Sequence, residues 1–262
     1  MKRFLALLLC LIMAVSTLAL ASCNGVKNPP ETTGTTAPSG DNNPDSSLTE
    51  EEKLFRNAYE KIGALINYKL ETEQTITSQG YTIKQVVLVK KDGRNEYIKT
   101  TNTEDASLNS EAWYVNEVYY GIVGGTGFKA NIPYATYVEK YMPSDSTGKG
   151  VLMNIPESWF EDVTLCHEGT AYYLEFIVNG IEYAEYLGSM SISGFDSIDN
   201  ISYKVYFTST GELDKIATEF TMYQDDVEIS VVATTKISDI DSTVITAPEN
   251  ADGFVDMTDS LA

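Results

Sequence analysis

The sequence is poor in histidine, cysteine and basic residues. It holds one histidine, His167, and three cysteines, and 18 Lys and Arg side chains stand against 38 Asp and Glu. A single histidine excludes a His-based catalytic triad and a metal site built from several histidines. The acidic excess disfavours nucleic acid and anionic lipid headgroups as electrostatic partners. We therefore expect no nucleic-acid partner.

The few cysteines also exclude a disulfide framework. Cys10 lies inside an N-terminal apolar run and Cys23 directly follows it, so Cys166 is left alone in the rest of the chain. The hydrophobic core must then hold the fold without a crosslink. Cys166 and His167 are adjacent, but neighbouring side chains of a strand point to opposite faces and cannot share a proton. We predict no catalytic residue, no metal and no cofactor, and hence no enzyme.

The N-terminus has the order of a secretory signal. Two basic residues at positions 2–3 precede an apolar run over 4–21, and the run ends in Leu-Ala-Ser-Cys at 20–23. This ending is similar to the bacterial lipobox, in which a small residue precedes a cysteine whose thiol accepts diacylglycerol. We predict a lipoprotein signal peptide over 1–22 and a palmitate-containing diacylglycerol anchor on Cys23. The run is also long enough for an uncleaved membrane-spanning helix, which is the alternative.

Composition divides the rest of the chain into a linker and one domain. Residues 24–47 are rich in Pro, Thr, Gly, Asn and Asp, and such a segment buries too little apolar surface to offset its ordering entropy. We expect residues 23–47 to be a lipidated cysteine with a flexible linker and residues 48–262 to be a binding domain. Loss of residues 1–22 removes two basic and no acidic residues, which takes the net charge from −20 to −22. The expected location is extracytoplasmic, with a lipid anchor in the cell membrane.

Hydrophobic periodicity predicts one leading helix followed by many strands. A capping box at 49–52 and apolar residues at helical spacing predict an amphipathic helix that ends near residue 67. Alternation of period two then predicts a series of strands, which indicates an α+β fold with a single curved antiparallel sheet. The strands are expected at 68–77, 81–90, 94–101, 163–167, 171–178, 203–207, 213–222 and 227–233, and short helices at 134–141, 156–160 and 181–187.

Two segments give weaker signals. Residues 113–120 are apolar on both faces, so their orientation cannot be read from the pattern. Residues 121–162 are less regular, with Gly-rich turns over 124–127. The glycines are not followed by the strand-to-helix arrangement of a phosphate-binding motif, which argues against a nucleotide site.

The order of these elements resembles the LolA-like group, which comprises lipoprotein-sorting chaperones and lipid-carrier lipoproteins. The features that carry the resemblance are the lipobox, the leading helix, the hairpins over 68–101, the strand 203–207 that turns through Gly211 into 213–222, and the closing segment 244–251. The resemblance implies an open half-barrel capped by short helices, with an apolar cavity for acyl chains or lipidated proteins. It spans residues 49–251 and rests on pattern alone, with no catalytic signature.

The inward rows of the last strands are the candidate ligand-binding residues. On the resemblance, they line the concavity of the half-barrel and contact a lipid or a lipidated partner. They are Tyr203, Val205, Phe207, Ile216, Phe220, Met222, Ile229 and Val231.

Three other functions remain open from the sequence. The domain could be a cell-envelope interaction module with a fully packed core, since the same rows would fill such a core. The 17 tyrosines fit carbohydrate recognition, although tyrosine is also common in half-buried strands. A cell-wall hydrolase would need a pair of facing carboxylates, whose separation the sequence does not give. The acidic residues at 196, 199, 225, 226, 239 and 241 are interpreted as solvated loop residues, because none fits a calcium-loop spacing.

Overall fold

The computed structural model of the protein describes residues 49, 53, 54, 57, 61, 64–141, 160–169, 171–189, 195–209 and 212–261. The predicted signal peptide, Cys23 and the linker lie outside these residues. Within the described part of the chain, no helix has both the length and the apolar character needed to cross a membrane. Lys53, Leu54, Asn57 and Lys61 have helical backbone, as expected for the segment before the first strand.

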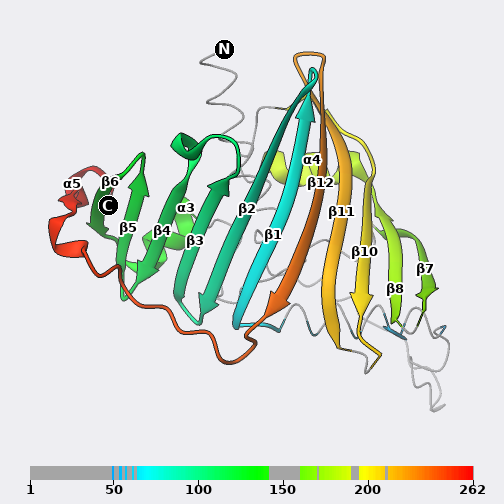
Figure 1. The fold of residues 1–262 in the computed structure, drawn as a ribbon, viewed down its shortest axis with the longest axis horizontal. Coiled ribbons are helices and arrows are strands. Elements are labelled where there is room, and N and C mark those ends of the chain that lie inside the picture. The colour runs from blue at the N-terminus through cyan, green and yellow to red at the C-terminus, as the bar shows by residue number, and fades with distance from the viewer. Residues whose placement is uncertain are drawn as a thin grey trace, which may run out of the picture.

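One large sheet forms the body of the described chain (Figure 1). Its edge-to-edge order is β13-β6-β5-β4-β3-β2-β1-β12-β11-β10-β8-β7, with β9 paired to β11. Every pairing is antiparallel except the short parallel contact between β13 and β6. The strands are β1 (Asn67–Ser78), β2 (Tyr81–Asp92), β3 (Asn95–Asn102), β4 (Ser110–Val115), β5 (Val118–Val123), β6 (Thr126–Asn131), β7 (Phe160–Glu168), β8 (Ala171–Val178), β9 (Ser197–Ile198), β10 (Ile201–Phe207), β11 (Leu213–Gln224), β12 (Val227–Ser238) and β13 (Val255–Asp256).

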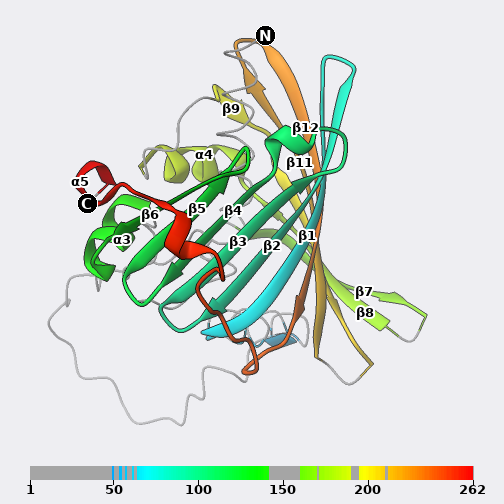
Figure 2. The same cartoon turned by 60° about the vertical axis from the view of Figure 1, so that its left-hand side comes forward.

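The sheet is open and curved, and its helices are few and short (Figure 2). This arrangement confirms the predicted α+β class with a single curved sheet. Beyond residue 64, the α-helices in the described part of the chain are α3 (Tyr134–Tyr141), α4 (Gly180–Ser189) and α5 (Thr258–Leu261), and the 3₁₀ turns there are η2 (Ala106–Leu108) and η4 (Ala251–Gly253). Helices α3 and α4 lie on the same side of the sheet (Figure 1).

Buried and exposed side chains alternate along the strands, so the two faces of the sheet differ. In β1 the even-numbered residues are buried, and the odd-numbered ones carry Lys69, Glu71 and Glu73 toward solvent. The buried positions of strands β1, β2, β8, β10, β11 and β12 form one apolar cluster. We call this side of the sheet the inner face. Tyr183 of α4 belongs to this cluster, and Leu54 and Leu65, which precede β1, pack against it. Helix α4 and the segment before β1 therefore cover part of the inner face.

A second, smaller cluster holds the other half of the sheet to α3. Tyr114 of β4 stacks on Tyr137 of α3, with ring centroids 3.8 Å apart and planes 8° from parallel. Ala130 and Ile132 complete its buried part. Burial of large aromatic surface in this stack fixes α3 on the inner face.

The segment after β12 runs along one end of the strands to the edge of the sheet formed by β6 (Figure 1). The side chain of Asn67 fixes its start, since its amide donates to the carbonyl of Thr243 and its Oδ1 accepts from the Thr243 amide, at 2.9 and 2.8 Å. Further along, the Lys129 ammonium donates to the carbonyl of Ala251 at 3.1 Å. These contacts bring β13 to the edge strand β6.

Three local differences from the sequence analysis have physical reasons. Residues 113–120 contain a hairpin, because Asn116 and Glu117 turn the chain with φ of 53° and 65° between β4 and β5. The region after residue 121 includes a regular strand, β6, that follows a second turn at Gly124 and Gly125. The helix expected through Phe160 is wrong at its last residue, since Phe160 begins β7 and pairs with Val178; residues 156–159 lie outside the described part.

Candidate functional site

The inner face brings all eight sequence-predicted ligand residues together. Seven of them belong to the buried cluster and Tyr203 packs against it as a partly buried member. They are distributed over β10, β11 and β12, which are neighbours in the sheet. The shared face is therefore as expected, whereas their role in ligand binding stays a prediction.

Strand register arranges the inner face into rows that run across the sheet. One row is fully apolar and consists of Ile83, Ile76, Val231 and Phe220. The neighbouring row differs, because it carries amides on one side and a phenol on the other. We call it the amide row, and its members from β3 to β8 are Asn102, Gln85, Gln74, Ala233, Thr218, Tyr203 and Phe176.

Gln74 and Gln85 are the chemically unusual members of this row. They stand opposite each other on β1 and β2, and their exposed fractions are only 3% and 2%. Nevertheless, Nε2 and Oε1 of Gln74 and Nε2 of Gln85 have no hydrogen-bond partner. A buried polar group left unpaired costs about 1–3 kcal/mol, so most such groups in folded proteins have partners.

Three other polar side chains in or beside the amide row, those of Thr72, Thr235 and Asn102, have hydrogen-bond partners. Thr72 and Thr235, in the next row, share a hydrogen bond of 2.9 Å between their hydroxyl groups. Oδ1 of Asn102 accepts from the backbone amides of Glu104 and Asp105 at 2.9 and 2.7 Å. On the amide row, the buried side-chain atoms without a hydrogen-bond partner among the described residues are therefore Nε2 and Oε1 of Gln74 and Nε2 of Gln85.

On the far side of the row, Tyr203 presents a half-buried phenol. Burial alone raises the pKa of this phenol well above its ordinary value. Its ring stacks on Phe176, with centroids 5.2 Å apart and planes at 8°. Between Tyr203 and Gln74 the row holds only the small side chains Thr218 and Ala233. The row therefore combines hydrogen-bonding groups at two positions with little side-chain volume between them.

A charged pair is buried three rows away on the same face. Lys91 and Glu96 stand opposite each other on β2 and β3, and both are almost fully buried. The Tyr137 hydroxyl donates to Oε2 of Glu96 at 2.8 Å. Burial, then the nearby Glu96 carboxylate, raises the pKa of Tyr137 well above its ordinary value. This network connects α3 to the sheet and is separated from the amide row by two rows, to which β2 contributes Val87 and Val89.

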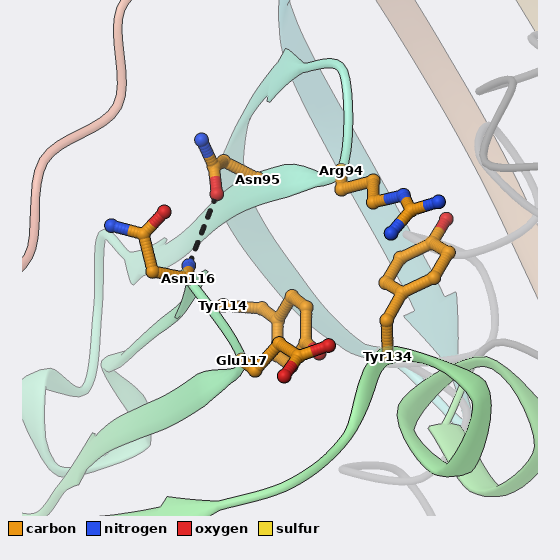
Figure 3. Close-up of a pocket in the computed structure, with 6 residues that line it drawn as sticks. All are labelled: Arg94, Asn95, Tyr114, Asn116, Glu117 and Tyr134. Atoms are coloured by element: carbon orange, nitrogen blue, oxygen red, sulfur yellow. Dashed lines mark hydrogen bonds between the residues drawn. The ribbon is translucent and has the colours of Figure 1, made fainter.

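A small polar pocket of about 200 Å³ lies at the end of this half of the sheet (Figure 3). Its walls include Arg94, whose guanidinium lies 4.9 Å from the ring centroid of Tyr134. They also include the turn residue Asn116, whose backbone N–H donates to Oδ1 of Asn95 at 3.2 Å. Burial, then the charge of Glu117, raises the pKa of Tyr114 to about 12. Ligand pockets usually hold about 300–1,000 Å³, so this one suits no more than a small polar molecule.

The remaining sequence candidates are separated in space. Cys166 lies within 4.0 Å of the Glu175 carboxylate, whereas His167 faces the ring of Tyr172, which packs on the inner cluster. Their opposite orientations are as predicted. The acidic loop residues occupy both ends of β12, with Asp225 and Asp226 before it and Asp239 after it. Among the described residues, no group of three or more His, Cys, Asp or Glu side chains is placed to hold a metal ion.

The sequence analysis missed the two glutamines and the Lys91–Glu96 pair. Gln74 stands at an inward position of a strand that alternates clearly, so a polar side chain on the predicted core face was the available signal. Gln85 has the same character in β2. What could not be read was that pairing places the two amides side by side.

Comparisons with known proteins return structures but no sequence relatives. No protein-family model matches the chain, and no curated protein sequence is similar to it. Among solved structures, LprF from Mycobacterium bovis matches with a TM-score of 0.42 and 10% identity over 76% of this chain and 96% of that one. The Mycobacterium tuberculosis lipoprotein LppX matches with a TM-score of 0.38 and 6% identity, over 74% of this chain and 97% of that one. A LolA superfamily protein from Nitrosomonas europaea matches with a TM-score of 0.28 and 10% identity, over 74% of this chain and 94% of that one. All three TM-scores are below 0.5, so the function is argued from the geometry above.

Proposed function

We propose that this protein is a non-catalytic surface lipoprotein that binds a lipid or other hydrophobic ligand on the inner face of its half-barrel. The observation that carries the proposal is the inner face itself, on which a wide apolar surface surrounds two buried amides without partners. A face meant only for packing gains nothing from such groups, because each one lowers stability. A ligand that lies on the apolar rows and reaches the amides would offset that cost.

A cell-envelope interaction module with a packed core is the second candidate. It is favoured by the burial of the predicted ligand residues, since Phe220 is 6% exposed and Val231 is fully buried. In that case the inner face would be an ordinary core, and binding would occur elsewhere on the surface.

Replacement of Phe220 by alanine separates these two functions. Phe220 lies in the apolar row beside Thr218 and Ala233, where a ligand chain would run. If the ring borders a ligand, its loss should cost less than the 3–5 kcal/mol usual for a buried Phe→Ala change and should reduce lipid uptake at least severalfold. The measurements are urea unfolding and mass spectrometry of lipid extracted from full-length protein purified from its native host.

A different result from the same two measurements would favour the packed interaction module. Wild-type protein without co-purified lipid, together with a full 3–5 kcal/mol loss in Phe220→Ala, would show that the inner face is a filled core. The outer-face variant Val232→Ala is the control, because Val232 is 47% exposed and points away from the cluster. It should change neither stability nor lipid content.

We further propose that the protein is extracytoplasmic and is held to the membrane by diacylglycerol on Cys23. In Cys23→Ala the acyl acceptor is gone, so labelled palmitate should no longer be incorporated and the protein should retain its signal or appear in the medium. Cys166→Ala is the matched control and should be labelled as the wild type is, because Cys166 lies in β7 of the folded domain. Equal labelling of wild type and Cys23→Ala would refute lipidation at this cysteine.

A further inference from the structure

The outer face of the sheet, opposite the inner face, carries a row of aromatic side chains on β3, β4 and β5. Strand register places Tyr97 opposite Trp113 and Trp113 opposite Tyr120. Their chain neighbours Glu96 and Tyr114 are buried with α3 on the inner face, so alternation directs the three rings to the other side of the sheet. Each of the three residues is only partly buried. We call them the outer aromatic row.

The rings of this row leave much of their faces uncovered. Tyr97 and Trp113 lie with ring centroids 5.1 Å apart and planes tilted by 44°, whereas the inner pair Tyr114 and Tyr137 stacks face to face at 3.8 Å. Tilted neighbours cover only part of each other's π surface, so a flat apolar partner can still lie on it. Neighbouring strands are about 4.8 Å apart, which is close to the length of one sugar unit in an extended glycan.

The C-terminal segment extends the row by one ring. Phe254 meets Tyr120 edge-on, with ring centroids 6.2 Å apart. It lies against β6 because Gly127 has no side chain there; a Cβ on Gly127 would collide with the Phe254 ring. The hydrogen bond from Lys129 to the carbonyl of Ala251 holds this part of the segment in place. Aromatic rings therefore cover four neighbouring strands, from β3 to β6.

The polar groups beside the rings are balanced in charge. The Tyr97 hydroxyl donates to Oε2 of Glu111 at 3.2 Å, and Oε1 of Glu111 lies 2.8 Å from Nζ of Lys99. The Lys90 ammonium lies 5.7 Å from the ring centroid of Tyr97. Ammonium groups donate hydrogen bonds and carboxylates accept them, so this set suits hydroxyl groups, which do both. An acidic polymer would instead meet the Glu111 carboxylate and a chain of net charge −20.

We infer that the outer aromatic row is a binding site for an uncharged, extended polysaccharide, on the face opposite the lipid site proposed above. The apolar faces of successive sugar rings lie on Tyr97, Trp113 and Tyr120, and their hydroxyl groups contact Lys99 and Glu111. A bilayer surface is a poorer partner, because aromatic residues at a membrane interface sit among the lipid headgroups, whereas these rings are already partly buried in the protein. The site goes beyond the proposed function and does not depend on it.

Trp113 makes the site measurable, since the chain has only two tryptophans and the other is Trp159. Full-length Trp159→Phe protein, in a detergent without a sugar headgroup, should show a saturable change in Trp113 emission with at least one of cellohexaose and chitohexaose. By isothermal titration calorimetry, Trp113→Ala should bind the same oligosaccharide about tenfold more weakly than the wild type. This factor corresponds to about 1.4 kcal/mol, within the range of one aromatic contact. The anionic hexagalacturonate should bind the wild type at least severalfold more weakly.

Tyr206→Ala is the matched control. Tyr206 is likewise a partly buried tyrosine of the outer face, with the Lys215 ammonium 4.4 Å from its ring centroid, but it lies on β10 in the other half of the sheet. Its loss should leave the affinity for the oligosaccharide unchanged. If Trp113→Ala does not fold, Trp113→Leu keeps an apolar side chain on the strand without an aromatic face and should show the same loss of affinity.

Four results would overturn the inference. They are no binding of either neutral hexasaccharide, an unchanged affinity in the Trp113 variants, tighter binding of hexagalacturonate, and contact of the row with a bilayer. The last is measured with Trp159→Phe protein in phosphatidylcholine vesicles that carry brominated acyl chains, in which Trp113 should keep its emission. Quenching there would mean that the rings face the membrane. The lipid content of Trp113→Ala should equal that of the wild type, so the inner-face proposal is tested separately.

Discussion

The free energy of unfolding should fall steeply once the pH rises above 10. Burial raises the pKa of Tyr137 and Tyr203 well above the ordinary value and that of Tyr114 to about 12. The unfolded chain releases these phenolic protons from pH 10 upward, whereas the folded protein still holds them. The unfolded state is thereby stabilised by up to about 1.4 kcal/mol per pH unit for each tyrosine. Stability is thus complete below pH 10 and declines above it.

Urea unfolding followed by far-ultraviolet circular dichroism between pH 8 and 11.5 measures this slope. Tyr203→Phe removes one half-buried phenol whose pKa is raised by desolvation, so it should reduce the slope by up to about 1.4 kcal/mol per pH unit with little change at pH 8. Tyr81→Phe is the matched control, since Tyr81 is 76% exposed, and it should keep the wild-type slope. A free energy of unfolding that stays constant to pH 11.5 would contradict the buried positions of these tyrosines.

Replacement of Phe176 by alanine should lower the free energy of unfolding by about 3–5 kcal/mol. Phe176 is fully buried in β8 and stacks on Tyr203, so its loss removes apolar burial and an aromatic contact and leaves a void. Three strands separate it from Gln74 on β1. Its role is therefore to pack the inner face.

The exposed aromatic residue Tyr81 provides the control for the stability loss expected in Phe176→Ala. Tyr81 lies at the first hairpin and is exposed, so Tyr81→Ala should change the free energy of unfolding by less than about 0.5 kcal/mol. Both variants are measured by urea unfolding at pH 7.5 under identical conditions. A loss below 1 kcal/mol for Phe176→Ala would mean that this end of the inner face is not a packed core.

The long hairpins were predictable because their signals are local. In β1 and β2, polar and apolar residues alternate over many positions, and Gln79 and Gly80 make the tight turn with positive φ. Helix α3 was predicted with its observed bounds, since a proline precedes it and apolar residues follow at helical spacing. Each of these elements is defined by residues within one turn or one strand of each other.

The hairpin of β4 and β5 gave no such signal. Tyr119 packs on the smaller cluster beside Tyr137, whereas Tyr120 packs on Phe254 from the C-terminal segment, so both faces of the strand are apolar. The turn between the strands is Asn-Glu, and glutamate is rare at positive φ. Its formation depends on aromatic partners more than 15 residues away, which a local pattern does not reveal.

The sequence by itself determined the face on which each strand residue lies, because side chains alternate with a period of two whatever the neighbouring strand is. It therefore gave the inward positions of Val205, Ile216 and Phe220. Only the tertiary structure decided which inward residues are neighbours, since β1 pairs with both β2 and the distant β12. That pairing places Gln74 between Gln85 and Ala233 and creates the amide row. The physical reason is that the backbone hydrogen bonds between strands fix register across the sheet, and register depends on the whole chain rather than on any one segment.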